Sequence, residues 1–367
     1  MSPRRDPAVT MRLPTVWLLS AYRADSHAAW ADWLTGEMTT VDWVVRELPG
    51  RHFRWRIRGN PLSWLDELPE LVPARILATS MVDIATLKGL HPRLADVPVD
   101  YYFHENQFAY PVSAQQVRSV EPQIVQLYGA LAADRLLFNS VFNRDSFLEG
   151  VDELLRRMPD TVPRGVRRRL VPRCDVLPVP VQAVPPARER DPRLILWNHR
   201  WEYDKAPEVF ADALVRLHDS GRDFRLALLG RRPPRETSAA LGRIRERMPE
   251  RIIADGRVDD ARYRALVGGA GIVVSSAIHE FQGLSVLEAC SAGVRPLVPD
   301  ALCYPEQYPG HYRYPPGDAR ALADRLAGWL DGGLPEPVDV SAWLATAVAP
   351  RWRSLFSPDV VTDEDLS

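Results

Sequence analysis

Short apolar runs alternate with amphipathic stretches along most of the chain, and this alternation limits the fold more than any other feature. The runs have the length and β-branched content of buried strands, and the stretches between them place apolar residues at helical spacing. Strand–helix alternation predicts parallel sheets with right-handed crossovers, so we expect an α/β protein. Strands are expected at 14–22, 42–50, 53–60, 74–83, 97–107, 135–140, 174–181, 193–200, 224–230, 252–258, 271–278 and 294–300. Helices are expected at 26–38, 121–134, 141–158, 205–221, 236–248, 261–270, 284–292 and 341–356, the last interrupted by a proline.

A proline-rich segment at 178–192, PVPVQAVPPARERDP, divides this alternation into two series. Prolines at this density interrupt regular structure and are typical of a domain boundary. A chain of 367 residues is also longer than one ordinary core needs. We expect two doubly wound, Rossmann-like domains facing a cleft, at 14–182 and 193–335. Residues 336–367 are expected to form a helix that crosses back to the first domain, followed by a tail.

The composition excludes several classes of protein. A formal net charge of −2 gives no global basic signal for nucleic acid or an anionic membrane. No apolar run reaches the roughly 18–20 residues that span a bilayer, and the N-terminus has no signal core. Three cysteines, Cys174, Cys290 and Cys303, are odd in number and lack metal-ligand spacing, so a cytoplasmic location is expected. Only two of the 46 basic residues are lysines, Lys88 and Lys205, which draws attention to each of them.

Two glutamates eight residues apart stand in the segment HEFQGLSVLEACSAG. Glu280 falls on the expected loop after the strand at 271–278, and Glu288 falls about one turn inside the following helix. Gly283 allows a tight turn between them, and free amides at a helix start attract phosphate. Sugar and ribose hydroxyls donate to carboxylates, so the pattern suits a nucleotide-sugar. The competing interpretation is a chance pair of glutamates on a helix.

Polar side chains also follow other strands at the edge where parallel sheets bind ligands. Arg200 and Lys205, in NHRWEYDK, put two cations near a helix start, which suits a diphosphate or, alternatively, a solvated basic loop. The first strand ends in SAYRADSH, which has no glycine, and Ser26 and His27 are its cleft candidates. The strand at 97–103 ends in four hydrogen-bonding residues, His104, Glu105, Asn106 and Gln107, of which the histidine is titratable near neutral pH.

These strings resemble a known family. The glutamate pair, together with the arginine and lysine of the second domain, resembles the retaining glycosyltransferases of family four, which have the GT-B fold. More narrowly, YYFHENQFAYPV (101–112), LLFNSVFNRDSF (136–147) and WNHRWEYDKAPEVF (197–210) are similar to the tRNA-queuosine α-mannosyltransferase family. The resemblance covers roughly 14–356. It implies transfer of mannose from GDP-mannose to queuosine in a tRNA anticodon loop, with an acceptor-side first domain and a donor-binding second domain.

The resemblance also implies a role for each matched residue. Glu280 and His104 would approach the donor hexose from opposite domains as catalytic residues. Arg200 and Lys205 would hold the diphosphate, and Glu288 the ribose. The remaining donor contacts would come from the backbone of Gln282, Gly283 and Leu284 and from Val258 near the base. No metal and no other cofactor is expected.

The acceptor is the least constrained part of this hypothesis. The family's first loop resembles a glycine pair followed by SH, whereas this chain reads ADSH at 24–27. A small metabolite, a lipid acceptor, or a non-catalytic RNA- or nucleotide-binding role therefore stays open, as does the oligomeric state. Transfer RNA needs a basic surface, for which 163–173 and the arginines of 231–251 are candidates, unless they are merely solvated.

Overall fold

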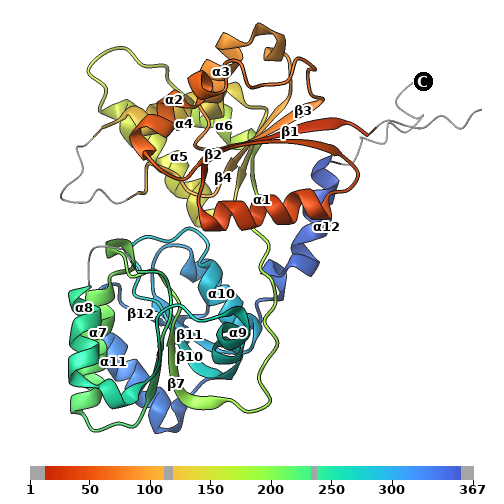
Figure 1. Cartoon of the computed structure of the whole chain (residues 1–367). Coiled ribbons are helices and arrows are strands. Elements are labelled where there is room, and N and C mark those ends of the chain that lie inside the picture. Colours follow the sequence, from red (N-terminus) through yellow and green to blue (C-terminus); the bar gives the residue numbers. More distant parts are fainter. Residues whose placement is uncertain (1–12, 111–118, 233–237, 357–367) are drawn as a thin grey trace, which may run out of the picture.

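Two α/β domains make up the computed structural model, which describes residues 13–110, 119–232 and 238–356 (Figure 1). Each domain has a six-stranded parallel sheet, ordered β2-β1-β3-β4-β5-β6 in the first and β12-β11-β10-β7-β8-β9 in the second. The predicted class, two doubly wound domains, is confirmed. The strands are β1 (Thr15–Arg23), β2 (Asp42–Pro49), β3 (Arg75–Thr79), β4 (Val99–Phe103), β5 (Arg135–Phe138), β6 (Cys174–Val176), β7 (Asp191–Trp197), β8 (Arg225–Leu228), β9 (Ile252–Asp255), β10 (Ala270–Val274), β11 (Arg295–Pro299) and β12 (Arg313–Tyr314).

Helices connect the strands and cover both sheets (Figure 1). They are α1 (Asp25–Glu37), α2 (Phe53–Ser63), α3 (Ile84–Leu90), α4 (Glu121–Ala132), α5 (Val141–Arg156), α6 (Val166–Leu170), α7 (Pro207–Asp219), α8 (Ala239–Arg247), α9 (Asp260–Gly269), α10 (Leu284–Ser291), α11 (Ala319–Gly328) and α12 (Ala345–Phe356). The beginning of the helix expected at 236–248 and the tail beyond 356 lie outside the described residues. Of the helices in the described ranges, none is both long and apolar enough to traverse a lipid bilayer.

The strand expected at 53–60 is wrong, because these residues form the first part of α2. Phe53, Trp55 and Ile57 alternate with arginines, which is a strand period, but only Ile57 of the three is fully buried. The ring of Trp55 lies over Gly59, four residues later, where an added Cβ would meet it at 2.5 Å. Residues four apart share one face of a helix, so this contact belongs to the helical conformation.

The C-terminal helix α12 packs on the first domain (Figure 1). Its Trp352 is fully buried and lies 5.1 Å from the ring of Tyr102 and 5.6 Å from that of Trp30. The Trp352 indole also donates to the carbonyl of Pro178, in the proline-rich linker, at 3.1 Å. Pro350 lies within α12 and does not end it. Aromatic packing therefore fastens the end of the chain to the first domain.

A second contact between the domains caps α5. The Oε2 atom of Glu306, in the second domain, accepts from the backbone amide of Val141 at 2.9 Å. Ser140, the N-cap residue of α5, accepts from the amide of Asn143 at 3.0 Å. The first amides of a helix have no acceptor in their own helix, and at α5 they donate to side chains from both domains.

Candidate active site

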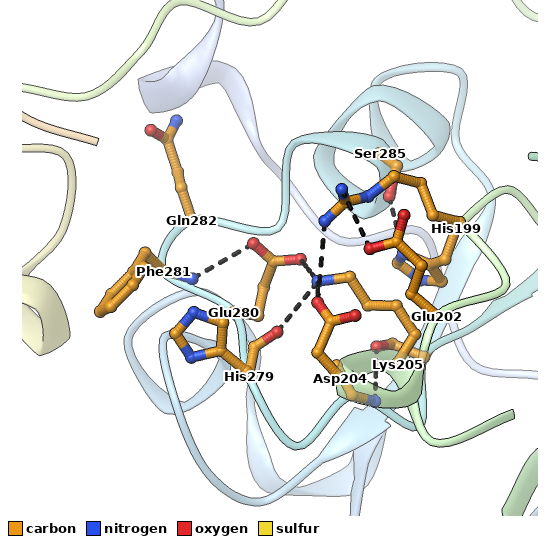
Figure 2. Close-up of polar contacts among 12 residues, drawn as sticks. His199, Glu202, Asp204, Lys205, His279, Glu280, Phe281, Gln282 and Ser285 are labelled. Atoms are coloured by element: carbon orange, nitrogen blue, oxygen red, sulfur yellow. Dashed lines mark hydrogen bonds and ion pairs between the residues drawn. The ribbon is translucent and has the colours of Figure 1, made fainter. Parts of the chain in front are cut away.

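Lys205 lies at the centre of a charged cluster at the carboxyl edge of the second sheet (Figure 2). Its Nζ donates to the carbonyl oxygen of His279 at 2.9 Å and to Oε2 of Glu280 at 3.0 Å. It also lies 3.3 Å from Oδ2 of Asp204. Only 8% of Lys205 is exposed, so these partners, rather than water, stabilise its positive charge.

The cluster fixes the ionisation of Glu280. Burial raises the pKa of this carboxyl. The charge of Lys205, then His199, the hydrogen bond from Lys205 and the Gly283 amide together outweigh burial and lower the pKa to about 2. Burial lowers the pKa of Lys205, whereas Glu280 and Asp204 raise it above the ordinary value. Glu280 is therefore a carboxylate, and Lys205 an ammonium, at any physiological pH.

Both cations of NHRWEYDK already have carboxylate partners. Arg200 lies 3.2 Å from Glu202 and 3.8 Å from Asp204, and Lys205 pairs with Asp204 and Glu280. Two cations and three carboxylates give this cluster a formal charge of −1. These side chains attract a diphosphate only if a cation changes partner, and the half-exposed side chain of Arg200 can do so because it is not packed in the core.

The start of α10 supplies uncharged donors beside Glu280. Gly283, the N-cap residue, has φ 69°, and an added Cβ would meet a ring carbon of Tyr304 at 3.1 Å. Both facts favour glycine at this turn. The amides of Val286 and Leu287 already donate to the carbonyl of Gly283, at 3.0 Å each, so the first two amides of α10, those of Leu284 and Ser285, are the ones that can bind an anion.

The side chain of Gln282 points away from the charged cluster (Figure 2). Its Oε1 accepts from the amide of Val179 at 2.9 Å, and its Nε2 donates to the carbonyl of the same residue at 2.7 Å. Val179 belongs to the proline-rich linker. Gln282 thus connects the loop before α10 to the linker between the domains. Its carbonyl accepts from Nε2 of Gln307 at 2.7 Å, which leaves its backbone amide for a ligand.

Glu288 projects from α10 toward α9. Its Oε2 accepts from the hydroxyl of Tyr263 at 2.7 Å. Burial raises the pKa of Glu288, and the Tyr263 hydrogen bond opposes this in part. Asn198, at the end of β7, donates to the carbonyl of Ser285 at 2.8 Å. Val258 is half-buried and packs against the core of the second domain.

Two stacked histidines form part of the first domain's edge. The rings of His27 and His104 lie 4.2 Å apart, nearly parallel, and Nδ1 of His27 lies 2.8 Å from the carbonyl of Tyr22. Trp30 and Tyr102 pack edge-on against His104. Burial, and then the charge of His27, lower the pKa of His104 well below its ordinary value. His104 is therefore a neutral imidazole.

The other candidates of the first domain differ in exposure. Asn106 is fully buried, where its amide donates to Asn143 and its oxygen accepts from the amides of Phe108 and Ala109. The side chain of Asn106 therefore makes its hydrogen bonds within the first domain rather than to a ligand. Glu105 and Gln107 are half-buried, with Gln107 Nε2 3.4 Å from Glu105 Oε1, and Ser26 is exposed on α1.

Charges of both domains act on Glu105. Burial raises the pKa of its carboxyl, His27, Arg200 and Lys205 act to lower it, and Asp204 acts to raise it. The ligand-binding roles of all these residues stay predictions.

Sequence reasoning missed three members of the site. Asp204 and His199 stand in NHRWEYDK, where an acid beside a rare lysine was an available signal. Tyr263 lies on a different helix from Glu288, and nothing in its local sequence marks it. Across the described parts of the chain, no group of His, Cys, Asp or Glu side chains forms a metal site. Metal-independent chemistry stays a prediction.

Neutral buried histidines make the site sensitive to acid. Burial, then Lys205, lower the pKa of both His199 and His279 to about 4, from an ordinary 6.5. The unfolded chain therefore binds more protons between these values, and the free energy of unfolding should fall as the pH falls from 6.5 to 4. We expect about 1.4 kcal/mol per pH unit from each histidine.

Urea unfolding at about pH 7 and about pH 5 measures this dependence. Between the two pH values, the free energy of unfolding of the His199→Asn variant should fall less than that of the unsubstituted protein. The difference should be roughly the contribution of one histidine, since the variant lacks one of the two. His311 is exposed, and His311→Asn is the matched control. Equal losses in all three proteins would contradict the expectation.

Comparison with known proteins divides the chain into the same two parts as the structure. A family model described as "tRNA-queuosine alpha-mannosyltransferase N-terminal" matches residues 15–181, and one described as "Glycosyl transferases group 1" matches 192–331. A tRNA-queuosine alpha-mannosyltransferase of Drosophila melanogaster is 32% identical over 327 residues, which are 85% of this chain and 86% of that protein.

Solved structures share the fold across nearly the whole chain. A sucrose-phosphate synthase from Thermosynechococcus elongatus superposes with a TM-score of 0.68 at 15% identity, and a lipopolysaccharide outer core galactosyltransferase with 0.64 at 13%; each covers 94% of this chain and 98% of its own. An Anabaena protein solved with UDP and glucose gives 0.60 at 13% identity, covering 94% of this chain and 95% of its own. At such identities the likeness shows the fold, which is GT-B.

Proposed function

Because the chain belongs to the tRNA-queuosine alpha-mannosyltransferase family, we propose that it is a cytoplasmic enzyme that transfers mannose from GDP-mannose to queuosine in a tRNA anticodon loop. The observation that carries the proposal is the ionised Glu280, held by buried Lys205 beside the first turn of α10. A carboxylate next to free helix amides offers acceptors for hexose hydroxyls and donors for a diphosphate within one loop.

The donor is held by complementary groups along this loop. The diphosphate lies against the first amides of α10, and Arg200 leaves its carboxylate partners to neutralise it. Glu280 accepts hydrogen bonds from the hexose, and Glu288 accepts from the ribose in place of the Tyr263 hydroxyl. His104 approaches the hexose from the first domain as a neutral imidazole, which can donate from one nitrogen and accept at the other.

The reaction then depends on position and charge. The bond between the anomeric carbon and the donor phosphate oxygen breaks, and a bond to an acceptor hydroxyl oxygen forms on the same face, which retains the configuration. The acceptor proton passes to the departing phosphate. Arg200 and the α10 amides stabilise the negative charge that develops on the leaving group, which is the main electrostatic contribution of the site.

A second acceptor class is favoured by one observation at the ADSH loop. Asp25 and Arg231 of the opposite domain lie 3.5 Å apart, both highly exposed. This puts a carboxylate between the domains where the family has a glycine pair, and a carboxylate repels an RNA backbone. The second candidate is therefore transfer to a small hydroxylated metabolite by the same site.

Incubation of the protein with queuosine-containing tRNA and GDP-mannose tests the proposal directly. We expect the mass of the queuosine nucleoside to rise by one hexose, and Glu280→Gln to remove nearly all of this transfer, because an amide cannot replace a charged acceptor. UDP- and GDP-linked sugars offered in parallel identify the donor. Lack of any hexose addition with every donor would refute RNA transfer, and donor turnover with small acceptors would then support the second candidate.

A further inference from the structure

The first half of α2 and the two residues before it form a strongly basic surface. Residues 51–58 read RHFRWRIR, with four arginines and no acidic residue. Arg51 and Arg54 are exposed, and neither lies within ion-pair distance of a carboxylate in the described structure. Arg58 is different, since it pairs with Asp83 and with Glu121. Cations at a helix start oppose the helix dipole, so their placement here is not explained by helix stability.

Trp55 gives this basic surface a flat aromatic platform. The residue is 52% exposed, although indole is among the most buried side chains of an ordinary core. One face of the ring lies against Gly59, whose Cα carries no side chain to push it away. The exposed part of the ring lies on a helix turn that also carries exposed arginines, at positions 54 and 58. An exposed ring among cations is the usual chemistry for stacking an unpaired base.

The platform begins at the carboxyl edge of the first sheet. The helix α2 follows the carboxyl end of β2, at the edge of the sheet where ligands bind. The ring of Phe53 packs edge-on against Tyr22 at 6.2 Å. Burial raises the pKa of the Tyr22 hydroxyl, and Glu105 and then Arg200, across the cleft, also act on it. The carbonyl of Tyr22 also lies 2.8 Å from Nδ1 of His27, which stacks on His104, so Tyr22 joins the platform to the histidine pair of the first domain.

The two arginine-rich regions predicted from sequence are less suitable. In the second domain, Arg235 lies outside the described residues, and the described arginines of 231–251 each pair with an aspartate or glutamate: Arg231, Arg232, Arg243, Arg245, Arg247 and Arg251. In the segment 163–173, Arg168 and Arg169 are exposed. However, Arg173 of that segment donates to the carbonyl of Ala133, just before β5, at the edge opposite the cleft.

We propose that the basic surface of α2, residues 51–58, binds the single-stranded loop of the acceptor RNA, with one unpaired base stacked on Trp55 and the flanking phosphates bound by Arg51 and Arg54. The inference rests on the proposed function, because it assumes an RNA acceptor. Unpaired bases of RNA loops can splay out and stack on aromatic rings whatever their sequence. The α2 surface would therefore bind the loop without reading its sequence.

Fluorescence anisotropy of a labelled anticodon stem-loop measures this binding. We expect Trp55→Ala to weaken it about tenfold to a hundredfold, and Trp55→Phe to restore most of the affinity, since phenylalanine keeps a π-face. Arg54→Gln should weaken binding and lower the slope of log K against log salt by roughly 0.7, the share of one phosphate contact on a single strand. Arg168→Gln, on the opposite edge, should change neither.

The variants separate this inference from the function on which it rests. The thermal shift produced by GDP-mannose should be unchanged in Trp55→Ala, which shows that the fold and the donor site are intact. If the unsubstituted protein transfers hexose to tRNA and Trp55→Ala binds RNA equally well, the α2 surface is not the docking site. Weakening by Arg168→Gln alone would assign docking to 163–173. Failure of the unsubstituted protein to bind or modify RNA would instead refute the proposed function.

Discussion

Replacing Lys205 with methionine should reduce kcat/KM for hexose transfer by at least about a hundredfold to a thousandfold, the size of effect seen when one charge-stabilising group is removed from an active site. Methionine keeps the volume of the side chain but leaves Asp204 and Glu280 near each other without a shared cation. The carboxyl of Glu280 then loses the interaction that holds its pKa at about 2, and burial alone raises that pKa. Glu280 becomes a poorer acceptor for sugar hydroxyls. Initial rates at several concentrations of donor measure the change.

The chain offers an exact control, because Lys88 is its only other lysine. Lys88 is half-buried on α3, away from the charged cluster, and Lys88→Met should leave transfer within about a factor of two, as expected for a surface substitution. A Lys205→Met enzyme with unimpaired kcat/KM would show that the Lys205–Glu280 pair only supports the fold. Urea unfolding of the same variant separates lost stability from lost chemistry.

Replacing Trp352 with alanine should lower the free energy of unfolding by about 3–5 kcal/mol, as for other fully buried large aromatic residues. The indole has no exposed surface, packs against Trp30 and Tyr102, and donates to the carbonyl of Pro178. The substitution leaves a cavity and an unpaired acceptor in one place. Urea unfolding followed by circular dichroism gives the value.

Trp55→Ala is the matched control for this substitution. It removes the same side chain from an exposed position, so stability should change by no more than about 0.5–1 kcal/mol. If the two tryptophan variants were equally stable, α12 would not be fastened to the first domain in the way the structure shows. A second, milder variant, Trp352→Phe, tests the same packing should Trp352→Ala fail to fold.

Much of this architecture was predictable because parallel α/β domains carry their pattern locally. Buried strands such as β3 and β10 are apolar runs, and α5 and α7 repeat apolar residues at helical spacing. The charged site was predictable for a related reason. Glu280, Arg200 and Lys205 each follow a strand of one parallel sheet, and the carboxyl ends of such strands meet at a common edge.

The predictions from sequence fail where the structure is determined by contacts that the local pattern of residues does not record. The alternation at 53–57 matches a strand, but the packing of Trp55 on Gly59 belongs to a helix. Asn106 stands in a string of polar residues at a strand end, yet its partners lie on α5, some 37 positions away in sequence. The Tyr263 hydroxyl reaches Glu288 only because α9 and α10 are neighbours in space. No single-sequence pattern records such pairings.

Because Glu306 of the second domain caps α5 of the first, the stability of the first turn of α5 depends on the distance between the domains. Burial raises the pKa of the Glu306 carboxyl, and the amides at the start of α5 offset part of that effect. Drawing the domains apart would return the carboxylate to water and leave the Val141 amide to find a solvent partner. Protonation of Glu306 removes the negative charge of this acceptor and so weakens the same hydrogen bond. The gap between the domains is thereby coupled to the fraying of one helix end, so amide exchange at Val141 would report directly how often the enzyme opens.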